Sequence, residues 1–132
     1  MIRKLQKPTA SELEILHVLW SRGPSTVRDV QDALNQKKDM GYTGVLKLLQ
    51  IMTAKGLVRR NESQRAHVYE ACRPAEQTKR QLAADMLQRV FEGYASQLMM
   101  HALAGHRASP QEIEELRRIL DAYKGDDDGA AE

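Results

Sequence analysis

The chain has 132 residues, of which 42% are hydrophobic and 29% are charged, so it has the composition of a globular domain and is too short for a large catalytic α/β architecture. Its formal net charge of +2 is unevenly distributed: residues 1–73 carry 13 Lys and Arg against 7 Asp and Glu, a balance of +6, whereas residues 74–132 carry 7 against 11, a balance of −4. The basic part indicates a polyanionic partner, and the acidic part does not.

A capping box marks the start of the first expected helix. Thr9 precedes Glu12 by three residues, a spacing at which each side chain accepts the backbone N–H of the other residue. Apolar residues follow at helical spacing, and Gly23 and Pro24 end the pattern. These signals predict an amphipathic helix between Thr9 and Gly23.

Two further helices are expected before the pattern changes. One starts at Ser25 or Thr26, and the other begins near Tyr42 and closes at Lys55 and Gly56. Glycine suits the left-handed backbone that often ends a helix, and lysine suits the negative end of the helix dipole.

A basic hairpin follows the three helices. Residues 57–60 and 66–69 predict two short strands, joined by the polar turn 61–65. This order is typical of a winged helix-turn-helix, whose third helix enters the DNA major groove while the hairpin wing lies on the backbone. We therefore expect a mostly α fold with a small β-hairpin wing, in which residues 1–73 form a winged-helix DNA-binding domain.

The acidic part of the chain has a helical pattern throughout. A long helix is expected from Pro74, a residue favoured at the first helical position, to Gly93. A shorter helix follows through residues 98–103, and a last one starts at the capping box of Ser109 and Glu112. Three short amphipathic helices bury too little surface to be stable alone, so they require a partner surface.

We expect residues 74–124 to be a C-terminal helical dimerisation region, in which two copies pair about a twofold axis. Packing of the same apolar stripes against the basic part is the alternative. Residues 125–132 are acidic and rich in Gly and Ala, which predicts a disordered tail. The residues expected at the dimer interface are Met86, Leu87, Val90, Phe91, Leu98, Leu103, Leu116 and Leu120.

The third helix divides into two faces when its residues are placed at intervals of 100°. The face expected to pack inward carries Val45, Leu48, Leu49 and Met52, and the opposite face carries Thr43, Lys47, Gln50 and Ala54. Thr, Lys and Gln side chains can bind base edges, although a polar helix face can also be merely solvated. The predicted base contacts are Thr43, Lys47 and Gln50, and the predicted phosphate contacts are Tyr42, Arg60 and Arg65.

A family resemblance rests on segments 12–20 (ELEILHVLW), 23–30 (GPSTVRDV), 42–45 (YTGV) and 55–58 (KGLV), and on Tyr69. Over roughly residues 8–121 the chain resembles the penicillinase-repressor (BlaI/MecI/CopY) family. The resemblance implies a homodimeric transcriptional repressor on palindromic operators in front of β-lactamase or other stress-response genes. Many such repressors are inactivated when a membrane-bound sensor metalloprotease triggers a cut in the dimerisation region.

The chain departs from the family pattern at several positions. Gly44 and Ile51 stand where members often carry Thr and Arg, so the operator sequence does not follow from the resemblance. The scissile Asn-Phe pair of the best-known members aligns with His101 and Ala102, so cleavage is not carried over, and the sensor protease is expected to act indirectly if it acts at all. The Cys-x-Cys cluster of the copper-responsive branch is absent from this sequence.

No sequence motif predicts an enzyme, a cofactor or a metal site. The chain lacks a glycine-rich phosphate loop, a nucleophile elbow and a convincing carboxylate pair. His101 and His106 are five residues apart, which is not the spacing of a helical zinc pair. Cys72 is the single cysteine and is interpreted as a buried or linker thiol in a reducing compartment. Without a long apolar run, we expect a soluble, cytoplasmic protein that does not insert into membranes.

A protein-interaction adaptor is the second hypothesis. Gly44, Leu46 and Ile51 stand on the third helix where polar groups would favour base reading. A winged helix with such a face can serve as a docking surface for another protein.

Overall fold

The structure is a computed structural model that describes the backbone of residues 6–130 and the side chains of residues 6–124. It divides into two compact units, Met1–Ala84 and Asp85–Glu132, which are described separately. The boundary between the units falls within one helix, α4 (Ala75–Arg89). None of the described helices is both long and apolar enough to cross a membrane.

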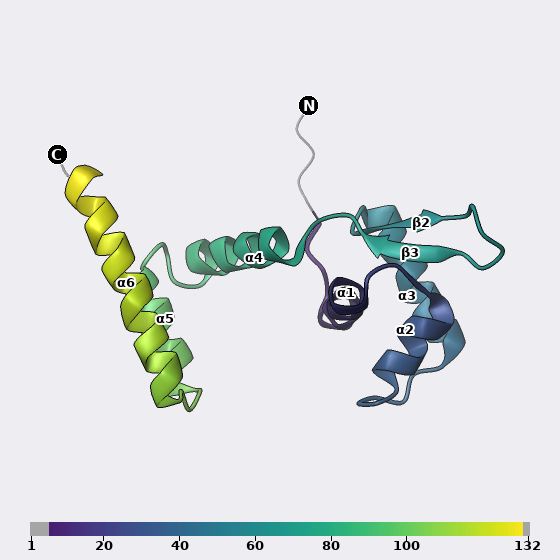
Figure 1. The fold of residues 1–132 in the computed structure, drawn as a ribbon, viewed down its shortest axis with the longest axis horizontal. Helices are drawn as coiled ribbons and strands as arrows, with labels where there is room; N and C mark the ends of the chain where they lie inside the picture. The colour runs from purple at the N-terminus through teal and green to yellow at the C-terminus, as the bar shows by residue number, and fades with distance from the viewer. Residues whose placement is uncertain (1–5, 131–132) are drawn as a thin grey trace. The chain divides into compact units, whose positions relative to one another are not determined.

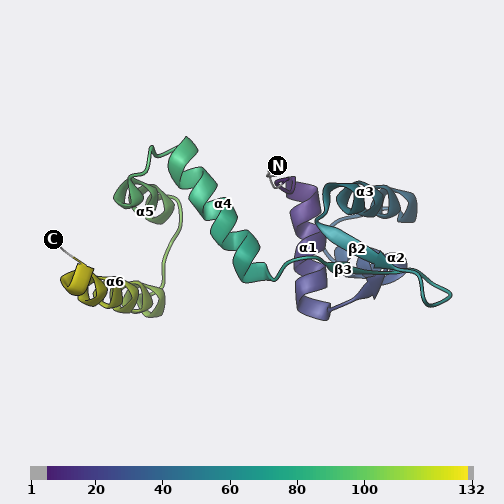
Figure 2. The ribbon, with the colours of Figure 1, turned by 90° about the horizontal axis from the view of Figure 1, so that it is seen from above.

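The first unit has the element order of a winged helix, as predicted. Figures 1 and 2 show β2 and β3 running side by side, with their connecting turn projecting beyond the helices. The elements are α1 (Ala10–Arg22), β1 (Ser25–Thr26), α2 (Val27–Leu34), α3 (Tyr42–Lys55), β2 (Val58–Asn61) and β3 (Val68–Ala71).

The wing is part of a three-stranded antiparallel sheet with strand order β1-β3-β2, where the sequence predicted only a hairpin. The strand β1 pairs Ser25 with Tyr69, and β2 pairs Arg60 with the same tyrosine. Both wing strands begin later than predicted. The backbone N–H of Leu57 donates to the Met52 carbonyl at 2.9 Å, so Leu57 completes the end of α3 and the ladder starts at Val58.

Local capping sets the helix ends. The predicted box at α1 is confirmed, with the Thr9 N–H 2.9 Å from a Glu12 oxygen and the Glu12 N–H 3.2 Å from the Thr9 hydroxyl. A second box joins Thr26 and Asp29 at α2, and hydrogen bonds from Thr26 lower the pKa of the Asp29 carboxyl. Gly56 ends α3 with a left-handed φ of 82°, as expected.

The core of this unit buries the predicted inner face of α3. Val45, Leu49 and Met52 are fully buried, while Leu48 is half-buried. Burial of each such side chain stabilises the fold by about 1.5–3 kcal/mol. The remaining core residues come from α1, α2 and the hairpin: Ile15, Leu16, Leu19, Val27, Val30, Leu34, Leu57, Val58 and Tyr69.

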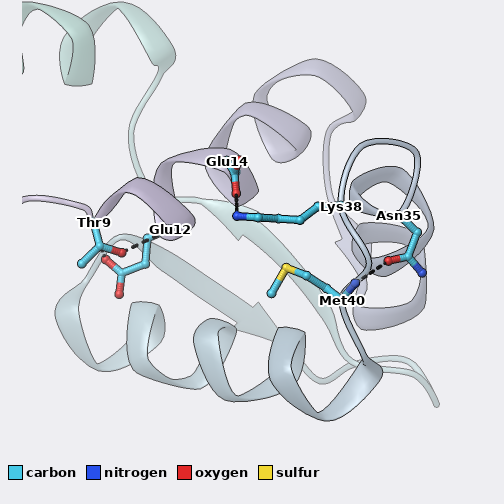
Figure 3. A network of polar contacts seen from close by, with 6 residues as sticks. All are labelled: Thr9, Glu12, Glu14, Asn35, Lys38 and Met40. Atoms are coloured by element: carbon cyan, nitrogen blue, oxygen red, sulfur yellow. Dashed lines mark hydrogen bonds and ion pairs between the residues drawn. The ribbon is translucent and has the colours of Figure 1, made fainter.

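A buried ion pair connects the start of α1 to the end of α3. The Glu12 side chain is 2% exposed, and its carboxylate accepts both the Thr9 N–H and the Lys55 ammonium, the latter at 2.8 Å. Figure 3 shows Glu12 turned toward Thr9. Burial alone raises the pKa of the Glu12 carboxyl, but hydrogen bonds from Lys55 and Thr9 outweigh burial and lower that pKa below its ordinary value. The pair therefore fixes α3 against α1.

The first helix of the acidic part is shorter than predicted. Pro74 lies just before α4, and its carbonyl accepts the Thr78 N–H at 3.3 Å. The helix ends at Arg89, because Glu92 and Gly93 both adopt positive φ values, 52° and 90°, which a right-handed helix cannot continue. Val90 consequently lies in a turn rather than in the predicted helix.

The helices α5 (Ala95–Ala104) and α6 (Pro110–Ala130) follow. The Ser109 hydroxyl accepts the Glu112 N–H at 3.1 Å, as the predicted box requires, whereas the Glu112 carboxylate pairs with His106 at 3.0 Å. Helix α6 extends into the segment 125–132 where the sequence predicted a disordered tail, and residues 131–132 lie outside the described part. The domain limits and the behaviour of that tail stay predictions.

We expect Lys55→Met to lower the free energy of unfolding by about 1–3 kcal/mol at neutral pH, because the buried Glu12 carboxylate loses its cation. The folded-state pKa of Glu12 is lowered, so the pair stabilises the fold above the unfolded pKa, and this contribution is lost as the pH falls through the folded pKa. The difference between wild type and variant in urea unfolding should therefore shrink on acidification.

The matched control is Lys38→Met, which breaks an exposed ion pair with Glu14 at 3.1 Å (Figure 3). This change should cost about 0–1 kcal/mol. If Lys38→Met and Lys55→Met cost the same, the buried pair is not what fixes α3.

Candidate nucleic-acid interface

The outer face of α3 is open to solvent. Thr43, Lys47, Gln50 and Ala54 are exposed, which is the face that the 100° placement assigned to the outside. No side chain caps the start of this helix at Gly41, so its first turn can offer backbone N–H groups to an anion. Tyr42 stands at that end and is 47% exposed. Contact of these residues with DNA stays a prediction.

The turn between α2 and α3 is held by side chains. The Met40 N–H donates to the Asn35 side-chain oxygen at 2.9 Å, as Figure 3 shows, and the Gln31 amide donates to the Met40 carbonyl at 3.3 Å. These bonds join the end of α2 to the residues before α3. Both the N–H and the carbonyl of Met40 are therefore held by side chains of the preceding segment, which fixes the start of α3 relative to α2.

The two arginines of β2 point in opposite directions. Arg60 lies opposite Tyr69 in the ladder, while Arg59 forms an ion pair with Glu70 at 3.0 Å. Arg60 also forms an ion pair with Glu62 in the wing turn. The hydrogen bonds to Tyr69 and Glu62 raise the pKa of the Arg60 guanidinium above its ordinary value.

An open groove of about 500 Å³, here called the wing groove, separates α3 from the wing. Of the six predicted DNA contacts, four line it, and Thr43 and Lys47 lie outside it. The groove is lined by Thr26, Val27, Arg28, Tyr42, Leu46, Gln50, Arg60, Arg65, Ala66, His67 and Tyr69.

Sequence reasoning missed two basic residues of the wing groove, Arg28 and His67. Arg28 is the second residue of α2, on the turn just after the Thr26 cap. His67 precedes the buried Tyr69 by two residues, and the alternation of a strand would have placed both on the same face. That alternation was the available signal for His67, whereas Arg28 carries no comparable signal.

The segment after β3 is tied to the winged helix. The Trp20 indole N–H donates to the Arg73 carbonyl at 2.9 Å, and the Arg73 guanidinium donates to the Gly56 carbonyl at 3.2 Å. Cys72 lies next to this joint as a half-buried free thiol. Among the described residues, no three His, Cys, Asp or Glu side chains gather in a way that could hold a metal ion.

The residues predicted at the dimer interface are half-buried or exposed in the single chain. Leu87, Phe91, Leu98 and Leu116 are half-buried, and the Phe91 ring contacts the His101 ring at a centroid distance of 5.7 Å. The exposed fraction is 51% for Met86, 64% for Val90, 37% for Leu103 and 62% for Leu120. Four further large apolar or aromatic residues of this part are exposed, namely Tyr94, Met100, Ile119 and Tyr123.

Comparisons with known proteins relate this chain to bacterial transcriptional regulators. The penicillinase repressor family profile matches residues 8–122. The transcriptional regulator BlaI of Mycobacterium tuberculosis is 32% identical over 119 residues, which cover 89% of this chain and 85% of that protein. The methicillin resistance regulatory protein MecI of Staphylococcus aureus is 21% identical, over 91% and 98% of the two chains. A solution structure of monomeric Bacillus licheniformis BlaI with the blaP half-operator matches at 19% identity and a TM-score of 0.49, over 57% of this chain and 92% of that one.

We expect Gly44→Ala to raise the free energy of unfolding by about 0.5–1 kcal/mol, because alanine loses less backbone freedom than glycine when a helix forms. A Cβ at Gly44 would have no heavy atom within 4 Å, so no clash opposes the gain. Gly56→Ala is the control with the opposite sign, since its left-handed φ of 82° strains an alanine. Urea unfolding of both variants checks the expectation, and a destabilised Gly44→Ala would contradict it.

Proposed function

Since this chain belongs to the penicillinase repressor family, we propose that it is a homodimeric repressor that occupies a palindromic operator and blocks the promoter by steric occlusion. The family consists of DNA-binding transcriptional repressors and is not enzymatic. The observation that supports operator binding best is the exposed polar face of α3 beside a groove lined with basic residues. The proposed targets are β-lactamase or other stress-response genes, and the proposed location is the cytoplasm.

In this proposal α3 reads bases and the wing binds the backbone. Thr43, Lys47 and Gln50 are exposed on α3, and these residue types can donate to or accept from base edges in the major groove. Phosphate contacts are assigned to Tyr42 and to the two wing arginines, Arg60 and Arg65. Their position around the wing groove supports this division of roles.

The acidic part is proposed to form the homodimer. Several of its large apolar side chains are exposed in the single chain, and α5 has no buried residue. Exposed apolar patches of this kind indicate a protein interface. Two copies related by a twofold axis would present two recognition helices, which is the symmetry of a palindromic site.

The proposal includes relief of repression by a membrane sensor metalloprotease only if that protease acts on this chain indirectly. His101 and Ala102, which align with the scissile pair of the best-known members, both lie within α5. A protease binds an extended backbone, so cleavage at this position would require local unfolding of the helix.

An adaptor that docks a protein on α3 is the second candidate. It is favoured by apolar residues on the recognition helix, since Ile51 is 40% exposed and Leu46 is half-buried in the wing groove. If the protein is such an adaptor, replacement of one of its basic residues would leave its interaction with DNA unchanged.

DNA binding by the full chain can be measured by fluorescence anisotropy on a duplex from the promoter of its own gene. The logarithm of the association constant should fall linearly with the logarithm of salt concentration, by about 0.9 for each neutralised phosphate. Arg65→Ala should lower this slope by about 0.9 on any duplex, whereas Lys47→Ala should weaken the promoter duplex more than an unrelated one. If neither variant changes binding, the adaptor replaces the repressor.

We expect Val90→Asp to produce monomers of about 15.0 kDa where the wild-type chain forms dimers, because the new charge would be buried at the interface. Val90 is 64% exposed in the single chain, so the substitution leaves the fold of one copy intact. Gln97→Asp adds the same charge at an exposed polar position of α5 and should leave the dimer unchanged. Light scattering after size exclusion measures both masses, and a dimeric Val90→Asp would refute this interface.

A further inference from the structure

The wing groove brings several basic side chains together on one surface. Arg28 comes from α2, Arg60 from β2, and Arg65 and His67 from the wing turn, so three separate elements bring basic groups to one concave surface. Among the described residues, none of those that line the groove is Asp or Glu. An anion is the ligand that such a surface fits.

Two of these arginines have no partner among the described side chains. Within residues 6–124, whose side chains the structure describes, neither Arg28 nor Arg65 forms an ion pair or a side-chain hydrogen bond. Tyr42, which is 47% exposed, lines the same groove, and a tyrosine hydroxyl can donate to an anion. The site therefore has charged and neutral donors on several sides.

The third arginine is engaged elsewhere. Arg60 is paired with Glu62 of the wing turn. The Arg60 and Glu62 side chains are 38% and 53% exposed, so water and an incoming anion can reach both. A phosphate oxygen offers the same acceptor chemistry as the glutamate carboxylate, and the two would compete for one guanidinium.

The position of the wing groove favours a DNA backbone phosphate as its occupant. One wall is the predicted base-reading helix, through Tyr42 and Gln50, and the opposite wall is the wing. A duplex whose bases are read by α3 has its sugar-phosphate strand beside that helix. An opening of about 500 Å³ accommodates a phosphodiester with its adjoining sugars.

We propose that Arg28 and Arg65 bind one phosphate of the operator backbone in the wing groove, and that Glu62 holds Arg60 until DNA displaces the carboxylate. This inference rests on the proposed function and assigns roles to Arg28 and Glu62 that the sequence did not suggest. Glu62 then acts as an internal competitor that weakens operator binding, both by occupying Arg60 and by repelling the phosphate.

The test compares the full-length wild-type chain with its full-length variants on the promoter duplex over a series of salt concentrations. Arg28→Gln should weaken binding about tenfold and lower the salt slope by about 0.9. Glu62→Gln should tighten binding about two- to fivefold, a gain that should vanish when Arg60→Gln is also present. Arg59→Gln is the matched control, because it removes the same charge from the neighbouring position of β2 but from an arginine that pairs with Glu70 outside the groove.

Each outcome decides between distinct conclusions. If wild-type protein shows no salt-dependent DNA binding, the proposed repressor function itself fails. If the wild type binds but Arg28→Gln behaves like Arg59→Gln, or if Glu62→Gln weakens binding, the phosphate site in the groove is overturned. The last arm of the test uses inorganic phosphate alone. If phosphate stabilises the wild type against heat but not Arg28→Gln, and Arg28→Gln leaves the salt slope of DNA binding unchanged, the groove binds a free anion instead of DNA.

Discussion

One buried carboxylate ties the start of α1 to the end of α3. Glu12 closes the start of α1 through Thr9 and receives Lys55 from the last turn of α3. Apolar burial has no direction, so the packing of Val45 and Leu49 alone would tolerate small rotations of α3 about its axis. A charged hydrogen bond of 2.8 Å to a buried carboxylate does have direction, and it ties the last turn of α3 to the start of α1.

The two parts of the chain differ in how much of their apolar surface they bury. The winged helix encloses its own apolar core, whereas the helices after it leave most of their apolar side chains in contact with water. Salt should act on the two proposed interactions with opposite sign. It screens the attraction between basic groups and DNA, and it also screens the repulsion between two acidic dimerisation regions. An increase in ionic strength would then release DNA while it preserves the dimer.

The features that sequence predicted correctly are those encoded by neighbouring residues. The box at Thr9 and the glycine at Gly56 specify helix ends locally, and a fixed rotation per residue sufficed to separate the two faces of α3. The strand β1 has two residues and no period, so it exists only through its pairing with β3. Apolar residues continue at helical spacing beyond the end of α4, so the sequence pattern did not show where this helix ends. Glu92 and Gly93, which both have positive φ, turn the chain there. Arg28 and His67 line one groove only as a result of tertiary folding, and no single segment predicts that they share it.

The indole of Trp20 is bonded to the carbonyl of Arg73, at the joint that follows the wing. Trp20 is also the only tryptophan in the sequence, so the intrinsic emission of the protein arises from this one place. The wavelength of this emission depends on whether the indole ring is in contact with water. Loss of the hydrogen bond to the Arg73 carbonyl would expose the ring further. The molecule thus carries its own optical probe of that joint, which can be followed in stopped-flow mixing without a dye.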